Sequence, residues 1–297
     1  MPKKAPPVFL DYDQAALDAA YDQAAYAPNR EQLIKRRIRD SERARQRIGD
    51  PERAAYGAAE IEQLDIYRTG RAASPVFIFI HGGAWRSGRS RDFVTPAEMF
   101  TTAGAHYVVP DFAWVQDVGG SLIVLADQVC RTVAWVHRNA ADFGGDPNRL
   151  YLGGQSSGGH LAARADNRLA AQLWPAGRHH QRRHVHQRHV RSGAGAAVGA
   201  QRLCQIRRRD GRRTEPDMPS RATARAAGRR LRHLRDPRIP ASEPRIRNRG
   251  QAAGKRVQLL VGEHYNHFEL PETLANPYGL LGRAVLDLMG LPAGGAQ

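Results

Sequence analysis

Hydrophobic residues along the chain follow two patterns, one typical of buried strands and one typical of amphipathic helices. Residues 76–80 are all apolar, and such a run of branched and aromatic side chains predicts a strand buried on both faces of a parallel sheet. Between residues 121 and 141 the apolar positions recur at helical spacing, which predicts a long helix with one buried stripe. The stripe consists of Leu122, Leu125, Val129, Val133 and Val136.

The remaining patterns predict strands and helices that alternate along most of the chain. We expect one or two helices within residues 11–45, further helices at 92–102 and 276–289, and further strands at 64–67, 106–109, 149–152 and 256–261. Such alternation predicts an α/β fold with a doubly wound, mostly parallel sheet. The chain divides into an N-terminal helical segment (1–55), a first part of the α/β core (56–163), a middle segment (164–250) and a C-terminal part of the core (251–297).

The middle segment differs from the rest of the chain in composition. The formal net charge of the chain is +16, yet residues 164–249 hold 23 arginines and six acidic residues, which gives +17 (23 minus 6) for this stretch alone. It contains no Phe or Tyr and only eleven Leu, Ile or Val residues, and we recognise no strand in it. We therefore predict that it is disordered or translated out of frame. The second hypothesis arises because arginine codons of the CGN type, read one base later, begin with G and encode residues common in folded domains.

Composition argues against metal, disulfide and membrane functions. Two cysteines, Cys130 and Cys204, argue against a disulfide-bonded scaffold and fit a reducing compartment. No apolar stretch of signal-peptide length follows the basic N-terminal residues, so we expect a cytoplasmic protein with no membrane span. The middle segment is rich in histidine, but its arginines would repel a cation, and we expect no metal and no other cofactor. These histidines are His179, His180, His184, His186 and His189.

A serine flanked by glycines follows the predicted strand at 149–152. In the sequence from Gly154 to Gly158, glycines stand two residues on either side of Ser156. Glycine permits the crowded, strained turn that lifts a nucleophilic hydroxyl above the edge of a sheet. The motif therefore predicts acyl-transfer chemistry at Ser156.

Two adjacent glycines, Gly82 and Gly83, follow the predicted strand at 76–80. A glycine pair after a buried strand can present free backbone N–H groups in a concave loop, as a developing oxyanion requires. Such a pair can also be a simple turn. With a nucleophile motif some seventy residues later, we interpret it as an oxyanion loop.

Three stretches together resemble the α/β-hydrolase esterases, in particular the kynurenine formamidase (arylformamidase)-like and carboxylesterase branch. They are HGGAW at 81–85, FGGDPNRLYLGGQSSGGHLA at 143–162 and YNHFELP at 265–271. The resemblance covers roughly residues 11–163 and 251–291. It implies that Ser156 is the nucleophile, that His267 is the general base, and that Trp85 lies near the acyl pocket. It also implies an oxyanion hole formed by Gly82, Gly83 and the backbone N–H of Ser157.

Other residues compete for the catalytic roles. His264 lies in the same loop as His267, and we favour His267 because the resemblance includes it. We expect His160 to be a packing or surface residue, since base and nucleophile come from separate elements. Asp111 and Asp146 precede the serine, the wrong order for the acid of this fold, and are interpreted as loop and turn residues.

The acid that would orient the histidine is left unassigned. The family pattern requires an Asp or Glu between nucleophile and histidine, which places it in the middle segment. Asp236 is a weak candidate among the acidic residues there, each of which is more simply a counter-charge to arginines. The others placed in the right order are Asp210, Glu215, Asp217 and Glu243.

The favoured prediction is a serine hydrolase that cleaves a small carboxylic ester or an N-formyl aryl-amide through an acyl-enzyme. Its partner would be a small-molecule substrate, with no specific nucleic acid and no membrane, and the sequence predicts no oligomeric state. The alternative is an inactive hydrolase remnant whose basic segment binds polyanions non-specifically. The lack of interleaved aromatic residues in that segment argues against specific nucleic-acid recognition.

Overall fold

The structure is a computed structural model that describes residues 6–8, 12–173, 184–187, 260 and 262–294. The chain separates into two compact units. The described part of the first unit comprises residues 6–8 and 12–22, with helix α1 (Gln14–Tyr21). The side chain of Asp13 caps this helix by accepting a hydrogen bond of 2.8 Å from the backbone N–H of Ala16. Every other element described below belongs to the second unit.

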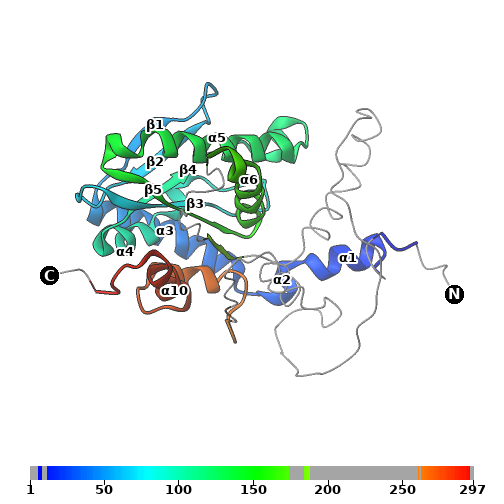
Figure 1. Cartoon of the computed structure of the whole chain (residues 1–297). Helices are drawn as coiled ribbons and strands as arrows, with labels where there is room; N and C mark the ends of the chain where they lie inside the picture. Colours follow the sequence, from blue (N-terminus) through cyan, green and yellow to red (C-terminus); the bar gives the residue numbers. More distant parts are fainter. Residues whose placement is uncertain (1–5, 9–11, 174–183, 188–259, 261, 295–297) are drawn as a thin grey trace, which may run out of the picture. The chain divides into compact units, whose positions relative to one another are not determined.

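A six-stranded mixed sheet forms the centre of the second unit (Figure 1), with strand order β1-β2-β4-β3-β5-β6. The pairs from β4 through β3 and β5 to β6 are parallel, whereas β1 with β2 and β2 with β4 are antiparallel. The sheet is mostly parallel, and the predicted α/β class is confirmed. The strands are β1 (Glu52–Ala55), β2 (Gln63–Tyr67), β3 (Ser74–Ile80), β4 (His106–Pro110), β5 (Gly145–Gln155) and β6 (His184–Gln187).

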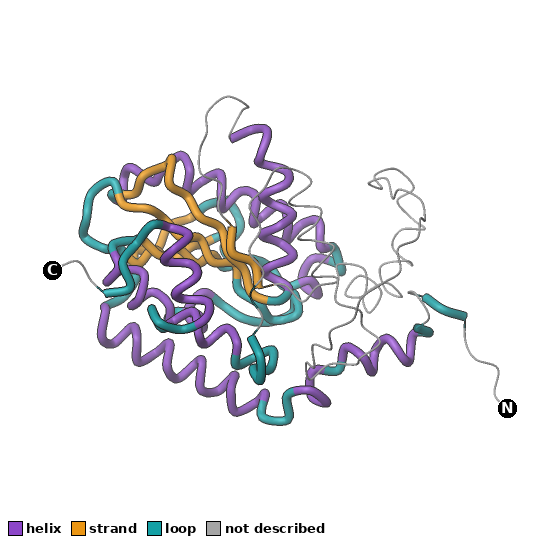
Figure 2. The backbone as a smooth tube through the Cα atoms, turned by 60° about the horizontal axis from the view of Figure 1, so that its bottom comes forward, coloured by secondary structure: helices purple, strands orange, loops and turns teal. Residues whose placement is uncertain are grey.

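Helices cover both faces of the sheet, as Figure 2 shows. The α-helices of this unit are α2 (Gln23–Tyr26), α3 (Arg30–Ile48), α4 (Thr95–Ala103), α5 (Leu122–Asn139), α6 (Ser157–Leu173) and α10 (Leu280–Met289). Short 3₁₀ helices lie at η1 (Ser90–Phe93), η2 (Val115–Val118), η3 (Ala140–Phe143) and η4 (Leu270–Ala275).

Strand β3 separates two hydrophobic cores by the alternation of its side chains. Val76, Ile78 and Ile80 pack into the core that includes α5 and α6. Phe77 and Phe79 pack into the opposite core, with α4 and α10. Since successive residues of a strand point to opposite faces, a fully apolar run fits this central position. The strand predicted at 76–80 is confirmed.

The amphipathic stripe of α5 is buried as predicted. Leu125, Val129, Val133 and Val136 are each at most 2% exposed, and Leu122 packs partly buried against the same core. The helix thus covers the β3 and β5 face on which α6 also packs.

Several boundaries differ from the sequence expectation. Strand β1 was not predicted, because its ERAA sequence is mostly exposed and lacks an apolar pattern. Strand β6 contradicts the expectation of no strand in the middle segment, and it pairs with β5 through backbone bonds that need no apolar side chains. Helix α10 begins at Leu280, not at residue 276, and its α-helical bonds start beyond Pro277 and Gly279. The strand predicted at 256–261 lies outside the described residues, apart from residue 260.

Candidate active site

Ser156 occupies a sharp turn between strand β5, which ends at Gln155, and helix α6, which begins at Ser157. Its φ of +54° lies in the left-handed region that residues other than glycine rarely adopt. Such strain persists only where the surroundings impose it, and it concentrates at functional sites. The predicted strand–turn–helix context of this serine is therefore present.

The two glycines of the motif are required by close backbone contacts. A Cβ on Gly154 would lie 2.6 Å from the backbone of Gly158. A Cβ on Gly158 would lie 2.1 Å from the carbonyl oxygen of Ile80 and 2.3 Å from that of His81. The start of α6 therefore packs directly on the end of β3, and this contact holds Ser156 beside the loop that follows β3.

His267 reaches Ser156 from a segment 111 residues further along the chain. Its Nε2 lies 3.1 Å from the Oγ of Ser156, which is hydrogen-bond distance. The structure thus brings together two of the predicted catalytic residues. His264, the competing histidine, is exposed, and the structure shows no such contact between it and Ser156 among the described residues.

The glycine pair after β3 lies beside the serine. A Cβ on Gly82 would lie 3.3 Å from the Cβ of Ser156 and 3.1 Å from the carbonyl oxygen of Gln155. Gly83 has a φ of +122°, and a Cβ there would lie 2.0 Å from the carbonyl oxygen of Ser87. A side chain at Gly82 would therefore crowd the nucleophile, whereas one at Gly83 would clash with Ser87 of the same loop.

Trp85 is tied to the turn by its backbone. Its N–H donates to the Oγ of Ser157 at 3.3 Å, and its φ of +62° follows one of +53° at Ala84. Its indole meets the ring of His160 edge-on, with ring centroids 5.9 Å apart. His160 therefore packs on Trp85, in agreement with the packing role expected for it.

His81 is buried and holds the loop that contains Gly82 and Gly83 by a hydrogen bond. Its ring is 1% exposed and stacks between Phe93 and Phe112, with centroids 5.1 and 4.3 Å away. The Nδ1–H donates to the carbonyl oxygen of Gly82 at 2.8 Å, and Nε2 has no hydrogen-bond partner among the described residues. Burial lowers the pKa of this imidazole to about 4, because a cation here would be desolvated. The ring is neutral at pH 7.

This buried imidazole predicts a stability change in mild acid. The pKa of His81 in the folded protein is below the usual 6.5. The neutral ring therefore contributes fully to the free energy of unfolding above pH 6.5, and this contribution is lost as the pH falls toward 4. The shift corresponds to about 3 kcal/mol. The variant His81→Asn keeps a donor but does not titrate. Between pH 7 and pH 4, we expect the wild type to lose about this amount of unfolding free energy relative to His81→Asn. Urea unfolding curves that stay parallel over this range would contradict the prediction.

The two carboxylates before the serine have structural roles. Asp111 accepts hydrogen bonds from the backbone N–H of Ser90 at 2.7 Å and from the guanidinium of Arg53, also at 2.7 Å. Asp146 accepts from the backbone N–H of Asn148 at 2.8 Å, as in an Asx turn. The candidate acids from Asp210 to Glu243, Asp236 included, lie outside the described residues.

Sequence reasoning missed a polar network next to His267. The side chain of Asn29 is hydrogen-bonded to those of Asn266 and Glu269 at 2.9 and 3.1 Å, and Glu269 also accepts from the backbone N–H of Asn266 at 2.9 Å. The sequence contained a signal for the part of this network that joins Asn266 to Glu269. Asn-x-x-Glu before a helix is a capping-box pattern, and these two residues stand before η4.

No metal centre or membrane span is found in the part of the chain that the structure describes. No group of three or more His, Cys, Asp or Glu residues there could hold a metal ion. No described helix is long and apolar enough to cross a membrane. Of the five clustered histidines, His184 and His186 lie on β6, and the other three lie outside the described residues.

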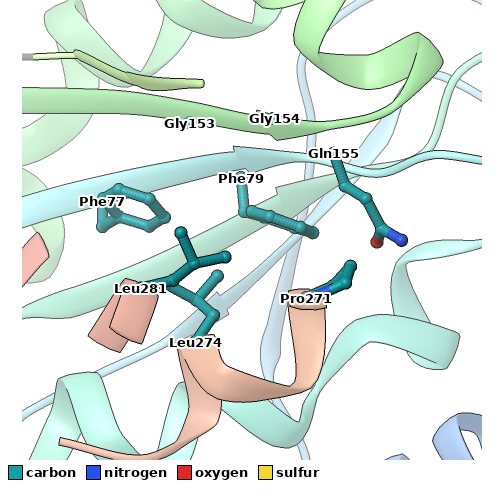
Figure 3. Close-up of a pocket in the computed structure, with 8 residues that line it drawn as sticks. All are labelled: Phe77, Phe79, Gly153, Gly154, Gln155, Pro271, Leu274 and Leu281. Atoms are coloured by element: carbon teal, nitrogen blue, oxygen red, sulfur yellow. The ribbon is translucent and has the colours of Figure 1, made fainter. Parts of the chain in front are cut away.

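A small pocket lies under the serine turn, on the α10 face of the sheet (Figure 3). The side chains of Phe77 and Phe79 on β3 face Leu274 and Leu281, and Gln155 closes one end. Its cavity volume of about 20 Å³ holds about one water molecule. It is too small for a substrate, and it marks where η4 and α10 pack against the sheet.

Among the comparisons with known proteins, the family match includes the turn at Ser156. Residues 64–173 match the family model described as BD-FAE. The probable isoprenylcysteine alpha-carbonyl methylesterase ICMEL1 of Oryza sativa is 35% identical over 113 residues, which are 36% of this chain and 25% of that protein. Esterase LipQ of Mycobacterium tuberculosis is 34% identical over 116 residues, 37% of this chain and 27% of that protein.

A hydrolase named for another substrate is similar over about the same share of this chain. Phenmedipham hydrolase of Pseudarthrobacter oxydans is 34% identical over 107 residues, 34% of this chain and 22% of that protein. The matched region thus spans about a quarter of the length of these relatives.

Among solved structures, a putative thioesterase from Silicibacter is similar with a TM-score of 0.46 and 24% identity, over 57% of this chain and 61% of that one.

These comparisons refine the sequence-based resemblance. They do not single out the kynurenine formamidase branch. The relatives named here are esterases and a hydrolase, and none is named for binding polyanions. The mostly parallel sheet fits an α/β-hydrolase fold, and the chain is similar to the BD-FAE family model over residues 64–173 and to esterases over about a third of its length.

Proposed function

We propose that the chain is a serine hydrolase that cleaves a small carboxylic ester or an N-formyl aryl-amide through an acyl-enzyme. The observation that carries this proposal is the 3.1 Å contact between His267 Nε2 and the Oγ of Ser156. A base within hydrogen-bond reach of a strained, presented hydroxyl is the arrangement that activates a serine nucleophile.

The reaction follows from these two side chains. The Oγ of Ser156 attacks the substrate carbonyl carbon while Nε2 of His267 takes its proton, giving a tetrahedral oxyanion. The carbon–heteroatom bond then breaks, and the His267 imidazolium returns the proton to the leaving alcohol or amine. Water next attacks the acyl-serine, giving its proton to Nε2, and the carboxylic acid leaves as Ser156 regains a proton.

The loop after β3 supplies the stabilisation of the oxyanion in this proposal. The backbone N–H groups of Gly82, Gly83 and Ser157 would donate to the oxygen as it gains charge. In support, no hydrogen bond from the N–H of Gly83 or Ser157 is found among the described residues, and Gly82 lies against Ser156. We assign Trp85, whose backbone N–H donates to the Oγ of Ser157, to the acyl pocket.

The names of the relatives favour simple esters as the substrates of this chain. Two of them are named as esterases, one for an α-carbonyl methyl ester, whereas the N-formyl aryl-amide rests on the sequence resemblance alone. The two cysteines favour a cytoplasmic enzyme.

Pre-steady-state kinetics test the acyl-enzyme. Mixed with excess p-nitrophenyl acetate, the protein should release a burst of p-nitrophenolate approaching one equivalent per active site, followed by slower turnover. An N-formyl aryl-amide, assayed in parallel, ranks the two substrate classes. A linear release of p-nitrophenolate with no faster initial phase, or no release, would contradict this proposal of an accumulating acyl-enzyme.

A further inference from the structure

We propose that Asn29, Asn266 and Glu269 position His267 for reaction, an inference that rests on the proposed function. These three residues form a closed ring of hydrogen bonds, two between side chains and one from the backbone N–H of Asn266 to Glu269, which joins the histidine loop to the residue that precedes helix α3. None of them contacts the reacting atoms in the role proposed. They act by fixing the backbone on both sides of His267.

The first part of the ring is a reciprocal cap around the histidine. The Oδ1 of Asn266 accepts from the backbone N–H of Phe268 at 2.9 Å and of Glu269 at 3.1 Å. The Oε2 of Glu269 accepts from the backbone N–H of Asn266 at 2.9 Å. The residues on both sides of His267 are therefore held by side chains, and the loop has little freedom to rotate its imidazole away from Ser156.

The second part of the ring joins this cap to α3. The Nδ2 of Asn266 donates to the Oδ1 of Asn29 at 2.9 Å, and the Nδ2 of Asn29 donates to the Oε1 of Glu269 at 3.1 Å. Asparagine at this position normally caps its own helix, yet Asn29 makes no side-chain capping bond to α3. Its amide instead bonds to Asn266 and Glu269, which are 237 and 240 residues further along the chain.

Helix α3 provides a rigid support for this link. It packs on α4 and η1, and its Ser41 donates to or accepts from the hydroxyl of Thr95 at 3.2 Å and accepts from the N–H of Val94 at 3.1 Å. Asn29 lies before residues 64–173, the stretch that matches the family model. The N-terminal helical segment (1–55), which the sequence patterns place outside the α/β core, thus contributes to the geometry of the proposed catalytic pair.

The test compares single variants under steady-state turnover of p-nitrophenyl acetate. We expect Asn29→Ala and Asn266→Ala to lower kcat about 10- to 100-fold with little change in KM, because a displacement of about 1 Å has an effect of this size. Asn266→Asp keeps the oxygen acceptor but replaces the donor to Asn29 with a charged oxygen beside Glu269, and it should lose at least as much as Asn29→Ala. Circular dichroism of each variant checks that the rates compared are those of folded proteins.

The matched control is Arg36→Ala. It removes an ion pair with Glu272, Nε to Oε1 2.9 Å, which joins the same two elements, α3 and η4, at an exposed position away from the loop. We expect its kcat to stay within about twofold of the wild type, since exposed ion pairs contribute little.

A double-mutant cycle separates positioning from general structural damage. If Asn266 acts through His267, then adding Asn266→Ala to His267→Ala should cost no further activity. An equal loss in both backgrounds would overturn the inference, as would full activity of Asn29→Ala and Asn266→Ala. Loss of turnover in Ser156→Ala with no effect of Asn266→Ala defeats this inference alone, whereas unchanged turnover in Ser156→Ala defeats the proposed function.

Discussion

Replacing Ser156 by alanine should lower kcat/KM for p-nitrophenyl acetate by at least about 10³-fold, the largest activity loss expected of any single substitution in the chain. The Oγ of Ser156 is the atom that forms the acyl bond in the proposed mechanism, and His267 Nε2, 3.1 Å away, activates it. Alanine tolerates the turn less well than glycine but adds no atoms, so the fold should survive.

A second serine provides the control for this measurement. Ser121 precedes α5 and makes no side-chain capping bond, so Ser121→Ala should keep the wild-type rate. Turnover by Ser156→Ala within tenfold of the wild type would show that another group carries the reaction. Circular dichroism of both variants checks that the comparison is between folded proteins.

Gly158→Ala should damage both stability and activity. The added Cβ would lie 2.1 Å from the carbonyl oxygen of Ile80 and 2.3 Å from that of His81, closer than real Cβ contacts. Both neighbours are backbone atoms at the end of a buried strand, so helix α6 must move away from β3. We expect a loss of about 3 kcal/mol in the free energy of unfolding. The displaced Ser156 should lose about 10²-fold in kcat/KM.

Urea unfolding and ester turnover, measured on the same preparation, check both effects. Gly294→Ala is the matched control, because a Cβ there finds no atom within 4 Å. If Gly158→Ala retained the stability and rate of the wild type, the close packing of α6 on β3 would be wrong.

The elements with strong periodic patterns were predictable from the sequence. The all-apolar run of β3 and the stripe of α5 led to correct elements because burial on both faces, or along one stripe, leaves a clear signature. The turn at Ser156 was predictable for a different reason. Its glycines follow from steric contacts, which depend on residue type at fixed spacing and not on hydrophobicity.

Elements held mainly by backbone bonds or by distant partners were not predictable. The short polar strands β1 and β6 gain their place by pairing with β2 and β5. The ring that includes Asn29 and Asn266 spans 237 residues, and no local pattern indicates that these two amides meet. The pairing of Ser156 with His267 was reached through a family resemblance, because spacing along the chain alone does not bring two loops together.

The most direct measurement is mass spectrometry of the protein quenched during the p-nitrophenyl acetate burst. We predict one added acetyl group, of about 42 Da, on the peptide that contains Ser156, at an occupancy equal to the burst amplitude. The His267→Ala protein should carry far less of it under the same conditions, because its serine lacks a base. An acetyl group found only on another residue, or a burst without any acetylated Ser156, would contradict the assignment of Ser156 as the nucleophile.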